Sequence, residues 1–145
     1  MHKPFAVFIF CIILFLISAC SSDKTTSSII YTDSLVLGIG ISGWNIVGES
    51  STFINNPAES GITIYYRIES KDDLKGSNLE FDIYRNTSSG FELIHIIPII
   101  NTYYTAHILV GSFIHTWGAG SFKASIRLIN TNQVIGVKEF TVVNK

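Results

Sequence analysis

The sequence predicts an all-β domain, an antiparallel sandwich of about seven strands that follows an N-terminal signal helix and a flexible tether. Three observations lead to this fold class. From Ser34 onward, apolar residues recur with a period of two rather than 3.6, and no helical stripe of similar length is found there. The apolar runs are rich in β-branched and aromatic residues, and short clusters of Asn, Asp, Gly and Pro separate them. Residues 34–145 are therefore expected to form the sandwich.

The first half of this domain contains three expected strands. In 35–41 Leu and Ile alternate with smaller residues, and in 62–69 Ile and Tyr alternate with Thr, Tyr, Arg and Glu. In 79–84 Leu, Phe and Ile alternate with Glu, Asp and Tyr. Such alternation is typical of a strand with one face in the core and one face in water. Turn signals at 55–57 and 75–78 separate these strands.

The second half contains four more expected strands. In 122–128 Phe, Ala, Ile and Leu alternate with Lys, Ser and Arg, and 133–143 follows the polar turn at 130–132. The runs 91–97 and 103–110 are more continuously apolar, and a Ser- and Gly-containing turn precedes the first of them.

The stretch from Phe91 to Ile100 departs from simple alternation because both of its faces are apolar. Pro98 has no N–H to donate to a β-ladder, which places the stretch at an edge or a bulge. Such an edge is either covered by the turn that follows it or exposed as a contact patch. In the second case we expect three aromatic anchors for a partner protein, because large rigid rings dominate interface energetics. These anchors are Tyr103, Tyr104 and Trp117.

The last two expected strands form a hairpin. It runs from Gly118 to Ile129, crosses a polar turn and returns from Val134 to Val143. This segment of about 26 residues resembles the closing hairpin of immunoglobulin-like and fibronectin-like domains in bacterial exported proteins. The resemblance implies an immunoglobulin-like arrangement of the sandwich. An eight-stranded lipocalin-like barrel is the alternative, for which the chain is short.

The N-terminus has the layout of a secretory signal. His2 and Lys3 precede an unbroken apolar run from Phe5 to Ile17. As a helix this run would span only roughly 20 Å, whereas the hydrocarbon core of a membrane is roughly 30 Å thick. Ser18 and Ala19 place small side chains at the end of the run, next to the expected cleavage site.

The residues Ile17-Ser18-Ala19-Cys20 resemble the lipobox of bacterial lipoproteins, in which an aliphatic residue and two small ones precede the modified cysteine. The resemblance implies removal of residues 1–19, diacylglycerol on the Cys20 thiol and usually a further acyl chain on the new amino terminus. Two or more acyl chains anchor a protein stably, whereas one chain gives marginal binding. Cys20 is therefore the expected lipidation site and the link to the membrane. The alternative is an unmodified cysteine at the end of an ordinary signal or an uncleaved anchor.

Residues 20–33 are expected to form the tether. Apart from 29–31 they are small and polar, and they cannot bury enough apolar area to offset their conformational entropy. A flexible chain of this length has a reach of roughly 20 Å, which keeps the domain close to the bilayer. Ser21 rather than Asp follows the cysteine, which resembles the outer-membrane address of Gram-negative lipoproteins. We expect an exported protein, lipid-anchored to the cell envelope, at the outer membrane in a Gram-negative host.

Composition excludes some classes of protein. The chain has 10 Lys and Arg against 11 Asp and Glu, and removal of the signal takes only Lys3 from this balance. A slightly acidic chain lacks the basic patch that nucleic-acid binding needs. Of the 2 cysteines, Cys11 lies in the signal, so no disulfide can form within the mature chain. The remaining length fits one domain with a single core.

Several patterns resemble catalytic or cofactor motifs, and each has a simpler structural explanation. Gly38–Gly43 matches G-x-G-x-x-G, which binds dinucleotides only where a strand turns into a helix. No helical stripe follows it, and we expect its glycines to allow a bend at the start of an edge strand. The histidines His95, His107 and His115 lack the paired spacing of zinc ligands. We therefore expect no catalytic residue, no metal site and no cofactor.

Five acidic residues cluster around one predicted hairpin: Glu69, Asp72, Asp73, Glu80 and Asp82. Their spacing lacks the order of a calcium loop. We expect a solvated, charged hairpin that discourages pairing between sheet edges.

Three hypotheses for function follow. The first is a non-enzymatic lipoprotein whose sandwich binds another envelope protein or supports an assembly at the membrane. The second is a carrier of a small apolar ligand or lipid between the two sheets. The third is a hydrolase or metal-binding protein that uses the histidines.

Overall fold

The computed structural model describes residues 35–70, 74, 76–99 and 107–145. These residues form nine strands and no helix. The strands are β1 (Val36–Ser42), β2 (Asn45–Glu49), β3 (Thr52–Asn55), β4 (Ile62–Glu69), β5 (Leu79–Thr87), β6 (Gly90–Ile99), β7 (Ile108–His115), β8 (Gly120–Leu128) and β9 (Gln133–Asn144). No helix in this part of the chain is long and apolar enough to cross a membrane.

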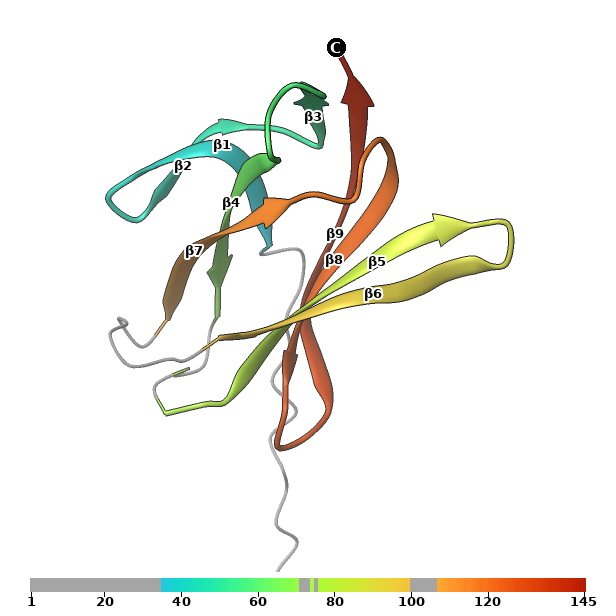
Figure 1. Ribbon diagram of the computed structural model, residues 1–145. Helices are drawn as coiled ribbons and strands as arrows, with labels where there is room; N and C mark the ends of the chain where they lie inside the picture. Colours follow the sequence, from blue (N-terminus) through green and yellow to red (C-terminus); the bar gives the residue numbers. More distant parts are fainter. Residues whose placement is uncertain (1–34, 71–73, 75, 100–106) are drawn as a thin grey trace, which may run out of the picture.

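The strands form the two sheets of a β-sandwich (Figure 1). The first sheet has the order β2-β1-β4-β7 and the second has the order β3-β9-β8-β5-β6. Every pairing between described strands is antiparallel except that of β3 with β9, which is parallel. In immunoglobulin-like sandwiches, strands C, F and G face a sheet that contains A, B and E. The order β9-β8-β5 opposite β1-β4-β7 is the same arrangement.

The core lies between the two sheets and is rich in aromatic rings. Phe81 of β5 is fully buried, and its ring centroid lies 4.5 Å from that of Tyr66 on β4 and 5.1 Å from that of Phe113 on β7. Phe140 of β9 continues the series, at 6.3 Å from Phe113 and 5.4 Å from Phe122 of β8. Aromatic pairs at these distances add to the stabilisation that comes from burial of apolar area. A continuous series of rings therefore joins the two sheets.

The predicted all-β sandwich is confirmed, but the number of strands is larger than expected. The two additional strands, β2 and β3, have 5 and 4 residues, and only one residue of the pair is fully buried. Neither strand is long enough or sufficiently buried to show a clear alternation. Of the expected strand at 103–110, residues 107–110 are described, and β7 begins at Ile108. The expected signal (1–19) and the expected tether (20–33), with Cys20, lie outside the described residues.

The glycines at the start of the domain serve close packing and a tight turn. β1 lies between β2 and β4, so the expectation of an edge strand is wrong. A Cβ on Gly38 would collide with the Ile46 side chain and approach the carbonyl oxygens of Val47 and Gly48 to 2.9 and 3.0 Å. Gly43 has a φ of 61° at the first central position of the β1–β2 turn, which is characteristic of type II′. The chain then continues into a strand, whereas dinucleotide binding would require a helix.

Candidate functional site

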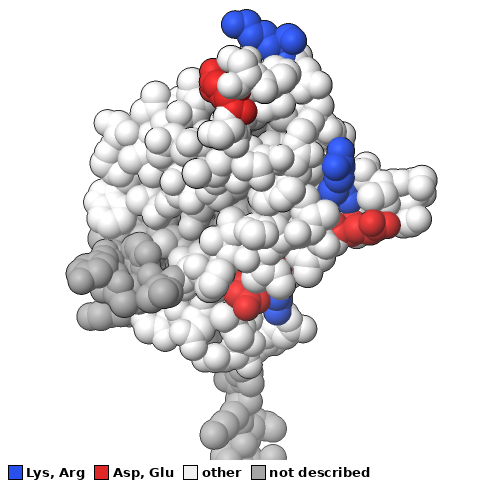
Figure 2. Space-filling view, viewed as in Figure 1, with Lys and Arg blue, Asp and Glu red and all other residues white. Residues whose placement is uncertain are grey.

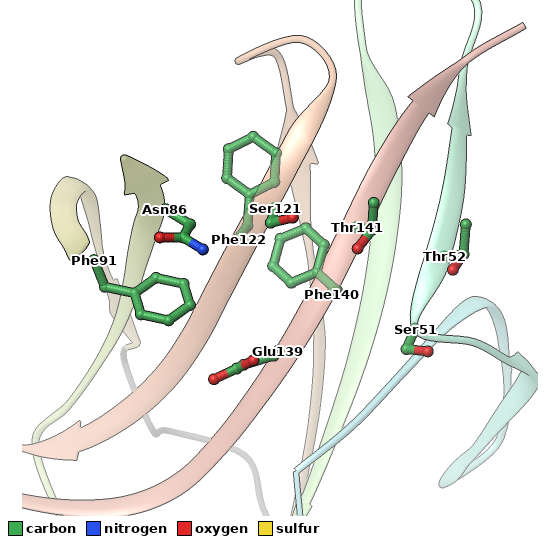
Figure 3. Close-up of a pocket in the computed structure, with 9 residues that line it drawn as sticks. All are labelled: Ser51, Thr52, Asn86, Phe91, Ser121, Phe122, Glu139, Phe140 and Thr141. Carbon is green, nitrogen blue, oxygen red and sulfur yellow. The ribbon is translucent and has the colours of Figure 1, made fainter. Parts of the chain in front are cut away.

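The outer face of the five-stranded sheet carries the candidate binding site. On this face lie the side chains that alternate with core residues, as Ser121 and Lys123 alternate with the buried Phe122 on β8. A groove of about 240 Å³ crosses strands β8 and β9 on this face (Figure 3). Its lining residues are Ser51, Thr52, Asn86, Phe91, Ser121, Phe122, Glu139, Phe140 and Thr141.

Strand register brings the polar lining of this groove together. Asn86 of β5 lies opposite Phe91 of β6, and Ser121 of β8 lies opposite Thr141 of β9, which pairs in turn with Thr52 of β3. Figure 3 shows Asn86 and Phe91 on one side of the groove and Thr52 on the other. Within the described part of the chain, the side chains of Asn86, Ser121 and Thr141 make no hydrogen bond. Their amide and hydroxyl groups are therefore available to a bound partner.

Two charged residues define the electrostatics of the groove. The Lys123 ammonium lies over the rings of Tyr84 and Phe91, at 4.4 and 4.6 Å from their centroids. These cation–π contacts favour a fixed position for Phe91, which lines the groove. Glu139 lies opposite Lys123 in the β8–β9 register, yet it has no ion pair among the residues that the structure describes. The Glu139 carboxylate therefore leaves a negative charge exposed in the groove.

Farther along the same face, two carboxylates hold an arginine. Nη2 of Arg127 donates to Oε2 of Glu80 at 2.6 Å, and Nε of Arg127 donates to Oδ2 of Asp82 at 3.0 Å. The hydrogen bond with Asp82 is the main cause that raises the pKa of Arg127. Asp82 is only 1% exposed, so the expectation of a solvated acidic cluster is wrong for this residue. Its partner is 45 residues away in the sequence, and only the pairing of β5 with β8 brings the two together. Asp72 and Asp73 lie outside the described residues.

Strand β6, which contains most of the two-sided apolar stretch, is covered on one face and exposed on the other. It is an edge strand of its sheet, as predicted. Ile99 is buried, and Ile94 and Ile97 pack against the core. Leu93 and Ile96 are exposed on the outer face, the face that carries the groove. One face of the strand therefore packs against the core and the other is exposed, while the turn expected to cover the stretch lies outside the described residues.

Trp117 lies within the described residues, whereas the other two predicted anchors, Tyr103 and Tyr104, lie outside them. The Trp117 ring is partly buried and packs against the core, with its centroid 5.3 Å from the His95 ring and 5.1 Å from the His115 ring. His95 pairs with a core-facing residue of β5, so this aromatic group lies on the core side of the sheet. Trp117 is not one of the residues that line the groove.

His115 is a buried histidine that the fold keeps neutral. Its Nε2 lies 2.8 Å from the carbonyl oxygen of Gly118 and donates to it, while Nδ1 has no hydrogen-bond partner in the described part of the chain. The ring of Phe122 lies edge-on at 4.6 Å. Burial lowers the pKa of His115, the hydrogen bond to Gly118 partly opposes this shift, and the charge of Arg85 adds to it.

We expect the protein to lose stability as the pH falls below about 6.5, the ordinary pKa of histidine. The unfolded chain takes up a proton on His115 near that pH, whereas the folded protein takes it up only at a lower pH. Between these two pKa values the unfolded state binds more protons, so the free energy of unfolding decreases with falling pH. Urea unfolding of the wild type and of His115→Phe, followed from about pH 8 to pH 5, measures this slope. An equally steep slope in His115→Phe would assign the effect to another group.

The histidines do not gather into a metal site among the described residues. His107 comes directly before β7 and His115 ends it, so these two residues lie at opposite ends of one strand. No three His, Cys, Asp or Glu side chains of the described ranges lie close enough together to hold a metal ion.

No family model and no curated protein matches this sequence.

Proposed function

We propose that this protein is a bacterial envelope lipoprotein whose immunoglobulin-like sandwich is a non-enzymatic binding module. Acyl chains on Cys20 would hold it at a membrane, and its partner would be another protein of the envelope. The sequence Ile17-Ser18-Ala19-Cys20 after an apolar run supports the anchor. The near-neutral balance of charge supports a protein partner rather than a nucleic acid.

The observation that carries the binding function is the composition of the outer face of the five-stranded sheet. The register aligns exposed Leu93 with Tyr84, Lys123 and Glu139 in one row across four strands. The groove lies beside this row, and its amide and hydroxyl groups have no partner among the residues that the structure describes. Protein interfaces combine apolar and aromatic anchors with polar groups that gain hydrogen bonds on association. The outer face offers both kinds of group side by side.

The packing of the core supports binding on the outside of the sandwich over transport of an apolar ligand within it. The rings of Tyr66, Phe81, Phe113, Phe140 and Phe122 follow one another between the sheets at centroid distances of 4.5 to 6.3 Å. A ligand in this region would have to displace rings that pack against each other.

Co-purification from detergent-solubilised envelope tests the proposal, with Leu93→Asp compared against Ile114→Asp. Both residues are exposed aliphatic side chains on edge strands, but Leu93 lies on the outer face of the five-stranded sheet and Ile114 belongs to the other sheet. We expect Leu93→Asp to weaken capture of the partner by about tenfold or more, because one interface hot spot is worth about 2 kcal/mol. Ile114→Asp should capture the partner as the wild type does.

Equal capture by the two variants would place the binding surface elsewhere. A wild-type protein that purifies alone from the envelope would contradict the binding function itself.

A further inference from the structure

The β1–β2 hairpin concentrates exposed apolar side chains at one extremity of the molecule (Figure 1). Ile39, Ile41 and Val47 are 65%, 37% and 47% exposed, and Trp44, at the turn, is 42% exposed. The type II′ turn places this large ring beside Gly43 at the tip. Single exposed apolar residues are common, but a cluster of this kind marks an interaction surface.

The part of this hairpin nearest the tip carries no charge that would resist an apolar environment. The one charged residue of the two strands, Glu49, ends β2 and lies opposite Gly38, away from the turn. No Lys, Arg, Asp or Glu occurs between Leu35 and Gly48. In Figure 2 the part of the visible surface that lies over the hairpin is free of charged side chains. Transfer of a charged side chain into lipid is expensive, so its absence removes the main barrier to contact with a bilayer.

The exposed apolar residues lie on both faces of the hairpin. In the register, Ile41 pairs with Ile46 on one face, and Ile39, two residues before Ile41, lies on that same face, whereas Val47 pairs with Gly40 on the other. A docking protein would cover one face of a hairpin and leave the other in water. Lipid surrounds an inserted hairpin on all sides, so apolar residues on both faces together with a Trp at the tip favour a lipid surface.

We propose that the β1–β2 hairpin inserts its tip into the lipid surface, with Trp44 at the boundary between head groups and acyl chains. This inference rests on the proposed function, which brings the domain to the bilayer, and it adds a second membrane contact to the acyl chains.

The length of the tether allows the anchor and the hairpin to meet the same bilayer. β1 has 7 residues, so the tip of the hairpin lies about 23 Å from the start of the strand. The proposed tether and Ser34, which joins it to the domain, would together reach up to about 50 Å when fully extended. The tether is therefore long enough to run back along β1 and place Cys20 at the level of Trp44.

The backbone limits the depth of insertion. β2 is an edge strand of its sheet, so one side of its backbone has no ladder partner among the described strands. Unpaired N–H and C=O groups are tolerated among hydrated head groups but not in the hydrocarbon core. Insertion therefore stops at the interface, at a depth of about 5–10 Å.

Quenching of Trp44 fluorescence by brominated lipid tests the proposal. The chain contains 2 Trp residues, so Trp117→Phe leaves Trp44 as the sole reporter and Trp44→Phe leaves Trp117 as the matched control. The full chain is expressed in bacteria, purified from the cell fraction that holds it and mixed with phosphatidylethanolamine–phosphatidylglycerol vesicles with or without brominated acyl chains. We expect bromine to remove about half of the Trp44 emission, since the ring lies within about 5–10 Å of the acyl boundary. The Trp117 emission should not change.

Equal Trp44 emission in both kinds of vesicle would overturn the proposal. So would a blue-shifted Trp44 in a protein that self-associates without vesicles, because a second copy would then cover the hairpin. Mass spectrometry of Cys20 in the same preparation tests the anchor separately. A chain without acyl groups would contradict the proposed anchor, while the quenching would still report on the hairpin.

Discussion

Replacing Phe81 by Ala is expected to lower the free energy of unfolding by about 3–5 kcal/mol, the usual result of emptying a buried aromatic site. Phe81 has no exposed surface. Its ring packs against Tyr66 of β4 and Phe113 of β7, two adjacent strands of the facing sheet. The truncation would therefore remove the ring that links both strands to β5. A domain of this size has about 5–15 kcal/mol of stability in total, so this one substitution would remove a large fraction of it.

Urea unfolding of Phe81→Ala and of the wild type measures this loss of free energy. Two further variants provide a scale for it. Phe81→Leu keeps most of the apolar volume and should cost less than Phe81→Ala. Ile54→Ala truncates an aliphatic side chain that is 64% exposed and should change the free energy of unfolding by less than about 0.5 kcal/mol. A loss for Phe81→Ala no larger than that for Ile54→Ala would show that the ring is not at the centre of the core.

The strands that could be predicted are those in which burial alternates along the chain. β4 keeps apolar residues on the core face along its whole length, β8 does so from Phe122 to Leu128 and β5 from Leu79 to Ile83, and the predicted ranges overlap these strands. β2 and β3 could not be found in this way. Gly48 interrupts the pattern of β2, and β3 gains its place from a parallel pairing with β9 near the other end of the domain. Local pattern carries no information about such a partner.

The candidate site was harder to predict than the fold, because its residues lie on different strands and only the pairing register of those strands brings them together. Glu139, Ser121 and Asn86 lie on three strands, and nothing in their own segments distinguishes them from other surface residues. The same reason explains the error at Asp82. An acidic residue in an alternating strand is usually solvated, and only the approach of Arg127 across the β5–β8 pairing makes its burial tolerable. Pro98 in β6 was the useful signal, because it predicted an edge or a bulge, whereas the apolar pattern alone left open whether the strand was covered or exposed.

If both proposals hold, the β1–β2 hairpin and the outer face of the five-stranded sheet have separate roles. The membrane contact would come from the first sheet and the partner contact from the second, since β1 and β2 belong to one sheet and the groove strands to the other. A sandwich held through one sheet leaves the other free to meet a partner. Both proposed contacts require the proposed acyl anchor on Cys20, because without it the domain would not remain at a bilayer.

Replacing Cys20 by Ala is expected to abolish acylation completely and to leave the precursor uncleaved. The thiol is the group that would carry the diacylglycerol, and Ala has no nucleophile to replace it. Labelling of growing cells with radioactive palmitate, followed by immunoprecipitation, measures this loss directly. The sequence also offers a matched control, because Cys11→Ala removes the second thiol of the chain from within the proposed signal segment and should leave labelling and processing unchanged.

The loss of the anchor should also move the protein within the cell. Each buried methylene of an acyl chain contributes about 0.8 kcal/mol to membrane binding, so two or three chains retain a protein where an inserted hairpin tip alone would exchange with solution. After cleavage at an engineered protease site in the tether, the domain should therefore leave the membrane while the acylated fragment stays. Continued palmitate labelling of Cys20→Ala would contradict the assignment of the anchor to Cys20, as would a wild-type chain that takes up no label.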